Sequence, residues 1–346
     1  MRRRTFFRCS SYLLAGTAFR LPVPQANRLQ TVTGFVLANR LGICLPHEHL
    51  FSSFGLDGVV VTPEETQTIF NSVTAYLMKL KQMGCTTIMD CTAAYFGRNP
   101  MLLKRLSEAS GVNILTNTGI YGAANDRYVP PFALNETADQ LATRWVNEFV
   151  GGIDGTGIKP GFIKIGVDPV GPIGLSDIDR KLVQAACRTH QQTGLTIACH
   201  TSGNGQPGVG GAGQTALAEL AIVKAEGLTP NAWIWVHAQN CTDTAVHQQV
   251  ARQGGWLSFD GLQEGQLDKH LTLVKAMKET RLLNRVMLSH DGNSFRIRNT
   301  DTMRPYHLLF ETFVPMLKQA GFTDSDVRQM IVTNPAEAFK IRIRRA

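Results

Sequence analysis

Several features that would identify common classes of protein are absent from this sequence. Its 346 residues contain no low-complexity segment, and no run stays apolar over the roughly 20 residues that would span a membrane. The seven cysteines include no C-x-x-C pair and are scattered through apolar runs. We therefore expect free, buried thiols rather than a disulfide framework, and we expect no membrane partner.

Acidic residues are absent from the first 46 positions, which hold seven arginines. The last seven positions add four basic residues, Lys340, Arg342, Arg344 and Arg345. Residues 47–339 carry 24 basic against 27 acidic side chains, so the formal net charge of +8 belongs to the two ends of the chain. Because no basic stripe is interleaved with aromatic residues, the sequence argues against a nucleic-acid partner.

The basic N-terminus has the order of an export signal. The segment RRRTFFR is followed by the mildly apolar CSSYLLAGTAF, then by Arg20 and LPVPQA. The paired arginines resemble a twin-arginine signal, which exports proteins that are already folded. We expect residues 1–26 to be such a signal, which would place the protein in the periplasm or outside the cell. A disordered leader on a cytoplasmic protein is the alternative.

From residue 27 onward, short apolar runs alternate with helical patterns. Apolar strands that alternate with helices predict a parallel sheet covered by helices, and eight such units predict a single-domain (β/α)8 barrel over residues 27–346. An open doubly wound sheet is the rival, but its glycine-rich turn after the first strand is missing. The glycine run at 203–213 instead follows the fifth strand, and we interpret it as a loop over the barrel mouth. The expected strands are 41–46, 85–90, 112–118, 161–166, 195–199, 232–237, 255–260 and 286–290, and the expected helices are 63–82, 100–110, 136–150, 176–193, 214–226, 242–253 and 266–281.

Polar residues mark the ends of several expected strands, where barrel enzymes place their chemistry. In the stretch LPHEHLF, His47 and His49 are two residues apart and would project from the same face of an extended chain. His200 ends the fifth strand, His237 ends the sixth, and Asp291 follows the eighth. Any one of these is more typical of an ordinary core or loop residue. Their coincidence at one end of a barrel predicts a metal site.

Lys164 lies inside the buried strand GFIKIG. A protonated lysine cannot bind a cation, and burying it without a partner costs several kcal/mol. A neutral amine can instead take up carbon dioxide and become a carbamate, whose carboxylate can bridge two metal ions. The alternative is an ion pair between Lys164 and an acid such as Asp291.

These motifs resemble the phosphotriesterase family of the amidohydrolase superfamily, which includes lactonases. The resemblance runs from about residue 31 to residue 340. It rests on HEHL at 47–50, GFIKIG at 161–166, ACHT at 198–201, the histidine of WVHAQN, LSHDG at 288–292 and TNPAEAF at 333–339.

The resemblance implies two divalent metal ions bridged by a hydroxide, with zinc the first choice and manganese, cobalt or iron possible. Two neighbouring ions lower the pKa of a bridging water, so that hydroxide forms near neutral pH. Asp291 would accept the proton that is released on attack. The implied ligands are His47, His49 and Asp291 for the more buried ion, His200 and His237 for the more exposed ion, and carboxylated Lys164 as the bridge between them.

The loops after the second and third strands are expected to select the substrate. They hold Tyr95, Phe96, Arg98, Tyr121 and Tyr128, of which we take Tyr95, Arg98 and Tyr121 as substrate-binding. Tyr121 matches a position at which family members place an aromatic residue in the substrate pocket. Ordinary packing is the alternative for each.

Two positions depart from the pattern of the family. Some organophosphate-hydrolysing members carry an aspartate three residues after the sixth-strand histidine, as a proton relay. This sequence has Asn240 there, which argues against efficient triesterase activity more than against the metals. His290, beside the ligand Asp291, could assist the proton path or cap the strand.

We therefore expect a metal-dependent hydrolase of lactones or other carboxylic esters, with promiscuous cleavage of phosphotriesters. Family members that prefer lactones and members that prefer phosphotriesters share all six ligands, so a true phosphotriesterase or an amidase remains an alternative. A binding protein that keeps the barrel without catalysis is the alternative from another class, and the intact ligand set argues against it. The resemblance suggests a homodimer that acts on small molecules.

Overall fold

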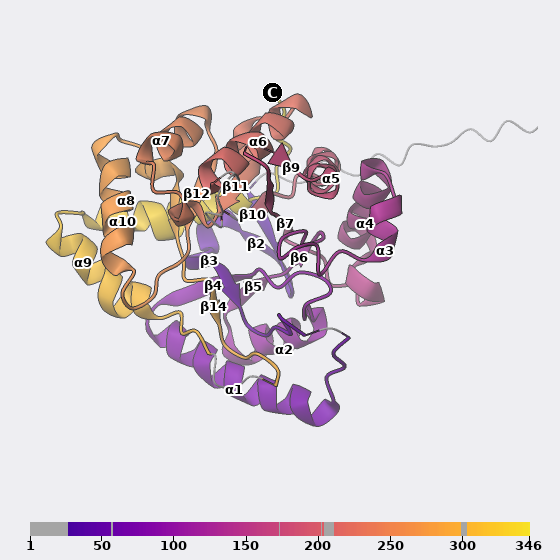
Figure 1. The fold of residues 1–346 in the computed structure, drawn as a ribbon. Helices are drawn as coiled ribbons and strands as arrows, with labels where there is room; N and C mark the ends of the chain where they lie inside the picture. The colour runs from indigo at the N-terminus through magenta and orange to yellow at the C-terminus, as the bar shows by residue number, and fades with distance from the viewer. Residues whose placement is uncertain (1–26, 57, 173, 202, 204–210, 299–302) are drawn as a thin grey trace, which may run out of the picture.

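The computed structural model describes residues 27–56, 58–172, 174–201, 203, 211–298 and 303–346 (Figure 1). The export signal expected at residues 1–26 and most of the glycine-rich loop expected at 203–213 lie outside the described residues. Among those described, no helix is long and apolar enough to cross a membrane.

Parallel strands form the centre of the molecule, and Figure 1 shows the helices arranged around them. The strands are β3 (Ile43–His49), β4 (Cys85–Asp90), β5 (Asn113–Leu115), β6 (Asn117–Thr118), β7 (Phe162–Val167), β10 (Ile197–Thr201), β11 (Trp233–Val236), β12 (Trp256–Phe259), β13 (Val286–Leu288) and β14 (Gly292–Asn293).

Two interrupted strands close the ring. One run of hydrogen-bonded strands has the order β13-β12-β11-β10-β7-β6, and the other has the order β14-β3-β4-β5. The third strand of the barrel is divided, because β5 pairs with β4 whereas β6, one residue later, pairs with β7. The eighth strand is divided in the same way, since β13 pairs with β12 and β14 pairs with β3. The expected (β/α)8 barrel is thereby confirmed, with its third and eighth strands each in two pieces.

The interior of the barrel is filled by one buried cluster to which all eight strands contribute. Because alternate residues of a strand point to the same side, Lys164 points inward two residues after Phe162, and His200 two residues after Ala198. The strand members of the cluster are Cys44, Met89, Leu115, Phe162, Ala198, Ile234, Val236, Trp256 and Met287.

The same cluster is closed from below by residues near the two ends of the described chain. Leu29 comes from the hairpin β1 (Arg28–Thr31) and β2 (Gly34–Leu37), and Phe339 comes from α11 (Asn334–Phe339). Neither the hairpin nor the C-terminal helices were expected from the sequence. Their packing leaves the carboxyl ends of the strands as the open end of the barrel.

The helices agree with the sequence-based boundaries to within about two residues where a helix was expected. Local capping explains several of them, as in α1, where Thr62 and Glu65 form a reciprocal capping box. The main helices are α1 (Pro63–Gln82), α2 (Pro100–Ser110), α3 (Pro131–Asn135), α4 (Ala138–Gly151), α5 (Asp177–Thr193), α6 (Ala212–Ala225), α7 (Thr244–Gln253), α8 (Leu267–Glu279), α9 (Val314–Gln319) and α10 (Asp324–Arg328), and π-helical turns precede α9 at Leu309–Phe313 and α11 at Gln329–Thr333.

The six cysteines in the described part of the chain are free and buried, as expected. Cys199 belongs to the outer core between strands and helices, whereas its neighbour His200 faces the barrel interior. This confirms that alternation turns the thiol away from the site. The seventh cysteine, Cys9, lies outside the described residues.

Glu219 is a fully buried carboxylic acid on α6, behind β10. Its oxygens accept hydrogen bonds from Thr201 Oγ1 at 2.8 Å and from Trp233 Nε1 at 2.9 Å. Burial raises the pKa of Glu219 to about 8, against the lowering effect of its hydrogen bonds. Between the ordinary value of 4.5 and this value, the folded protein holds a proton that the unfolded chain has released. The stability contributed by this group is therefore lost as the pH rises through that window.

We expect the free energy of unfolding of Glu219→Gln to exceed that of the wild type by about 1 kcal/mol or more at pH 8. Near pH 4.5 the two free energies of unfolding should differ little. The amide oxygen can accept from Trp233 while the amide nitrogen donates to Thr201 Oγ1, whose own proton can turn to the Cys199 carbonyl at 3.4 Å. Urea unfolding at both pH values measures the effect, with Glu264→Gln at an exposed position as the control. Equal destabilisation of Glu219→Gln at both pH values would contradict the assignment.

Candidate metal centre

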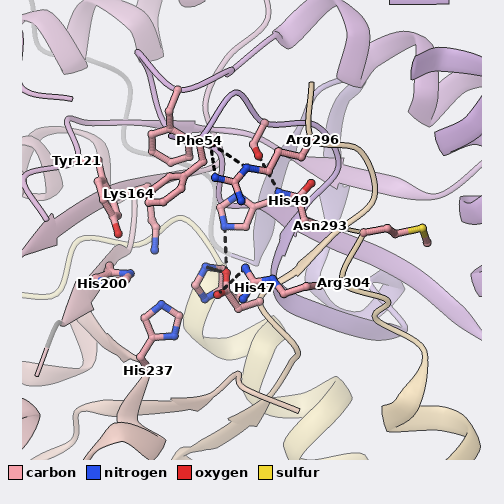
Figure 2. Close-up of a pocket in the computed structure, with 14 residues that line it drawn as sticks. His47, His49, Phe54, Tyr121, Lys164, His200, His237, Asn293, Arg296 and Arg304 are labelled. Atoms are coloured by element: carbon pink, nitrogen blue, oxygen red, sulfur yellow. Dashed lines mark hydrogen bonds and ion pairs between the residues drawn. The ribbon is translucent and has the colours of Figure 1, made fainter. Parts of the chain in front are cut away.

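A pocket of about 610 Å³ opens at the carboxyl ends of the strands, and its wall includes every metal ligand expected from the sequence (Figure 2). Its size is typical of sites for small molecules. Four histidines from three strand ends, one lysine and one aspartate converge on it. The residues that line it are His47, His49, Ser52, Phe54, Phe96, Tyr121, Lys164, His200, His237, Asp291, Asn293, Arg296, Met303 and Arg304.

The first strand brings its two histidines to one carboxylate. Nε2 of His47 lies 3.4 Å from Asp291 Oδ1, and Nε2 of His49 lies 3.2 Å from the same oxygen. These three atoms are close enough together to share one ion. Nδ1 of His49 lies 2.9 Å from Thr92 Oγ1, which itself donates to the carbonyl of Phe51. The hydroxyl oxygen therefore accepts a hydrogen bond from Nδ1–H of His49. Nε2 of His49 then carries no proton, and its lone pair is free to bind a metal ion.

Asp260, directly after β12, connects the first and sixth strands. Its oxygens lie 2.9 Å from Nδ1 of His47 and 2.6 Å from Nδ1 of His237. Asp260 lies close enough to both histidines to be considered as a third ligand of a metal ion. Its two oxygens, however, already accept hydrogen bonds from the two Nδ1–H groups. It therefore acts as the partner that sets the tautomer and orientation of both rings, so that Nε2 of each faces the pocket.

The charges around these groups move their pKa values in opposite directions. Burial, together with the charge of Lys164, lowers the pKa of His47 to about 3, although Asp260 opposes the change. Burial and the neighbouring His237 hold the pKa of His200 well below its usual range. Burial also disfavours the charged form of His237, but the Asp260 carboxylate outweighs it and raises the pKa of His237. Neutral His47 and His200 are the protonation states that metal binding requires.

Lys164 is the one member of the group whose polar atom has no hydrogen-bond partner among the described residues. The side chain is buried, and Figure 2 shows its amine directed into the space bounded by His47, His200 and His237. The ring centroids of His200 and His237 are 4.3 Å apart, and those of His47 and His237 are 4.9 Å apart. The ion pair with Asp291, the alternative considered for Lys164, is not present among the described contacts. Nitrogen and oxygen donors gathered around one pocket fit a metal centre.

The turn that carries Asp291 is held in an uncommon conformation. Asp291 has φ +53°, in the left-handed region that non-glycine residues rarely adopt. The buried carboxylate of Glu48 accepts hydrogen bonds from the backbone N–H of His290 at 3.1 Å and from that of Gly292 at 2.6 Å. One side chain thus binds the peptide groups on both sides of Asp291. For Asp291 itself, burial raises the pKa, but the hydrogen bond with His49 and the nearby His47, His237 and Arg304 outweigh burial and lower it.

His290 contributes to this turn and does not line the pocket. Its Nδ1 lies 2.9 Å from Glu48 Oε1, and its Nε2 accepts from the backbone N–H of Leu309 at 3.0 Å. Of the two roles considered from the sequence, the structure therefore favours the structural one. Asn240 is exposed in a short 3-10 turn after β11 and is likewise not among the residues that line the pocket.

The substrate-binding residues expected from the loops divide into two groups. Tyr121 lines the pocket, with its ring 5.1 Å from that of His200, and burial raises the pKa of its phenol well above the usual range. Phe96 and Phe54 continue this aromatic wall. Tyr128 packs against Phe96 behind the wall.

Tyr95 and Arg98, which were expected to contact the substrate, are not among the residues that line this pocket. Tyr95 has φ +72°, which turns its ring outward toward Phe132 and leaves it half exposed. Arg98 forms a bidentate ion pair with Glu148 of α4, at 2.8 and 2.9 Å, and donates to the carbonyl of Asn117 at 3.0 Å. It fastens the third strand to a helix and has no donor directed at the pocket.

Sequence reasoning missed several residues of the site. Asp260 was detectable, because it follows an apolar strand in the same way as the metal ligands do. Glu48 lies between the two histidines of the first strand, but nothing in the spacing indicates that it grips a turn more than 240 positions later. Phe54, Arg296 and Arg304 come from long loops and carry no sequence signal of their place in the wall.

Comparison with known proteins assigns the chain to a family. Residues 27–339 match the model of the phosphotriesterase family. The chain is 28% identical over 303 residues to a phosphotriesterase homology protein of Escherichia coli, covering 86% of this chain and 98% of that one. It is 27% identical over 318 residues to an aryldialkylphosphatase of Saccharolobus solfataricus, covering 86% and 95%.

Among solved structures, the organophosphorus hydrolase of Deinococcus radiodurans superposes with a TM-score of 0.78. The two chains are 28% identical, and the match covers 92% of this chain and 98% of that one. The family match extends over nearly the whole described chain, so the resemblance inferred from the strand-end motifs is confirmed. This chain belongs to the phosphotriesterase family, a family of hydrolases.

Proposed function

We propose that this protein is a binuclear metal-dependent hydrolase that cleaves lactones or other carboxylic esters and acts more slowly on phosphotriesters. The observation that carries the proposal is the convergence of four histidines, Asp291 and the unpartnered amine of Lys164 on one pocket. A protein that only bound a ligand would have no use for a buried lysine without a partner, because its burial costs free energy.

The ligands would divide between two sites. His47, His49 and Asp291 would hold one divalent ion, and His200 with His237 would hold the other. When bound, the two ions, zinc being our first choice, polarise the scissile carbonyl or phosphoryl group and acidify a water molecule. Asp260 keeps the Nε2 atoms of His47 and His237 directed at the pocket throughout.

Lys164 would serve as its carbamate. The neutral amine adds to carbon dioxide and releases one proton, which gives a carbamate whose carboxylate oxygens would be directed at both sites; starting from the protonated amine, two protons leave in total. This conversion removes the energetic penalty of an unpartnered buried amine, and it accounts for the absence of any acid within hydrogen-bonding distance of Lys164 among the described residues.

Two side chains are placed to move protons. Asp291 would accept the proton that is released when water attacks the substrate. Tyr121 keeps its phenolic proton, because burial raises its pKa, and so can donate a hydrogen bond to a leaving alkoxide. This leaving-group assistance favours esters and lactones, whose alkoxides need protonation, over triesters with good leaving groups. Of Tyr95 and Tyr121, both expected from the sequence to bind the substrate, Tyr121 lines the pocket and Tyr95 does not.

Two further proposals rest on the sequence and the family. We propose that residues 1–26 direct export by a twin-arginine-like route and that residues 27–346 form the catalytic domain, which would act in the periplasm or outside the cell. We also propose a homodimer. Comparing the secreted and cytoplasmic fractions, and the mass of the purified protein in solution, would test both.

The metal centre can be tested by binding. We expect the wild-type protein to bind about two zinc ions per chain and Asp260→Asn to bind them about 10–100 times more weakly. An asparagine has one side-chain oxygen and can accept a hydrogen bond from only one of the two Nδ1–H groups, so either His47 or His237 loses its orientation. Competition with a chromophoric chelator measures the affinity, and Asp268→Asn on the exposed face of α8 is the control. Zinc affinity that is unchanged in Asp260→Asn, or no zinc in the wild type, would remove this account.

Lys164→Ala should abolish hydrolysis, and short carboxylic acids such as acetate or propionate should restore part of it. The acid would occupy the space of the missing carbamate and supply its oxygens. Lys269→Ala, on the exposed side of α8, should behave as the wild type with and without acid. A crystal structure with both ions bound and an unmodified Lys164 paired to Asp291 would refute the carbamate.

The substrate class can be tested on one metal-loaded preparation with a panel of lactones, carboxylic esters, an amide and activated phosphotriesters. We expect kcat/KM for the best lactone or ester to exceed that for the best triester by at least about tenfold, which corresponds to about 1.4 kcal/mol in activation free energy. A triester preferred over every lactone and ester would overturn the substrate assignment but leave the metal centre standing. Preference for the amide would instead identify an amidase.

A further inference from the structure

Two arginines occupy the wall of the pocket, both from the segment after β14. Arg296 and Arg304 line it together with Lys164 and the histidines, whereas Asp291 is the only acid among the lining residues that the structure describes. Figure 2 shows Arg304 reaching the ligand group from the side away from Tyr121 and Lys164. The pocket therefore has an aromatic wall and a cationic wall.

The backbone places Arg304 independently of its side chain. The N–H of Asn293 donates to the carbonyl of Arg304 at 2.8 Å, and the N–H of Arg304 donates to the carbonyl of Asn293 at 3.1 Å. These two bonds form an antiparallel bridge to the end of the eighth strand. Any residue except proline could keep this bridge, so the backbone does not require an arginine here, and the contacts of the guanidinium distinguish it from other side chains.

The guanidinium of Arg304 is only partly committed. Its Nη2 donates to Asp291 Oδ2 at 3.1 Å, and none of its other side-chain donors has an acceptor among the described residues. Arg296 differs, because its Nε and Nη2 both donate to the carbonyl of Phe54, at 2.8 and 2.6 Å, and tie two loops together. Arg304 thus keeps an edge of its planar fork available, and this edge matches a carboxylate in geometry.

A neutral substrate would leave the free donors of Arg304 without hydrogen-bond acceptors. Enclosing an arginine against an uncharged ester removes water from its donors without replacing the lost hydrogen bonds. A carboxylate on the substrate would replace them with charge-assisted ones. Because Arg304 contacts Asp291, and Asp291 Oδ1 lies within 3.4 Å of both His47 and His49, such a carboxylate would lie only a few bonds from the scissile group.

We propose that the substrate of this enzyme carries a carboxylate close to the bond that is cleaved, and that Arg304 is the residue that selects it. This inference rests on the proposed hydrolase function and specifies its substrate class. Arg304 keeps Nη2 on Asp291 and presents its other donors to the substrate carboxylate. It is a specificity residue, and Arg296 adds positive charge to the same wall.

A matched pair of esters tests the proposal. Monomethyl succinate carries one carboxylate, and dimethyl succinate masks it as a second ester. We expect the zinc-loaded wild-type protein to hydrolyse monomethyl succinate with a kcat/KM at least about tenfold higher than that for dimethyl succinate, and Arg304→Met to lose at least about tenfold more on monomethyl succinate than on dimethyl succinate. Arg298→Met is the control, since Arg298 is exposed and faces Glu65 instead of the pocket.

Ionic strength provides a readout that a merely structural role would not change. Raising the salt concentration should lower kcat/KM for monomethyl succinate in the wild type, and this dependence should weaken in Arg304→Met, because screening acts on the charge pair. Equal losses on both esters in Arg304→Met would overturn the proposal by assigning Arg304 to the support of Asp291. A wild-type preference for dimethyl succinate would overturn it as well.

A binding measurement separates this proposal from the proposed hydrolase function. If the zinc-loaded wild type hydrolyses neither ester, the hydrolase assignment fails for this substrate class, and calorimetry with succinate and succinamide then decides the role of Arg304. Tighter binding of succinate that weakens in Arg304→Met would support the carboxylate site. If succinate bound only by chelating the metal, its affinity would be the same in the wild type and in Arg304→Met. Equal affinity in the two proteins would therefore overturn the carboxylate site.

Discussion

The site depends on one buried carboxylate that holds two distant strands in register. Asp260 binds Nδ1 of His47 on the first strand and Nδ1 of His237 after the sixth, and its burial is tolerable because Gln239 and the His237 backbone also donate to it. Each bond fixes the tautomer of a ring and the direction of its Nε2. The orientation of the donors is therefore a property of the protein before any ion binds, and less free energy is spent on ordering them when one does.

The scaffold and the wall of the pocket are built by different kinds of interaction. The ligands stand on strand ends and are braced by buried carboxylates, with Glu48 gripping the turn of Asp291 and Asp260 gripping two histidines. The wall comes from loops that are joined to the barrel by a few hydrogen bonds, such as the two backbone bonds between Arg304 and Asn293. Substitutions in the wall can therefore change which substrate fits while the strand-end side chains keep their places.

Much of the barrel and the ligand set was predictable from the sequence, for definite physical reasons. Buried parallel strands appear in the sequence as short apolar runs. A polar residue at the carboxyl end of such a run is expected to lie at the open end of the barrel. The rule would also have found Asp260. Tyr95 and Arg98 were expected to contact the substrate because of their loops and not because of this rule, and neither lines the pocket, since a left-handed φ turns one ring outward and Glu148 of α4 holds the other side chain. Neither event leaves a trace in local sequence.

The sequence by itself determined the fold class, the strand order and the residue types that converge at the barrel mouth, since periodicity and strand-end chemistry are local properties of the chain. Only the tertiary structure decided which carboxylates face the pocket and which are occupied by hydrogen bonds from histidine rings and backbone N–H groups. It also showed that the third and eighth strands close the ring in two pieces, and that Arg304 faces the pocket while Arg98 does not. Each of these outcomes depends on hydrogen bonds between residues far apart in the chain, and such partners are chosen by the packed geometry of the whole barrel.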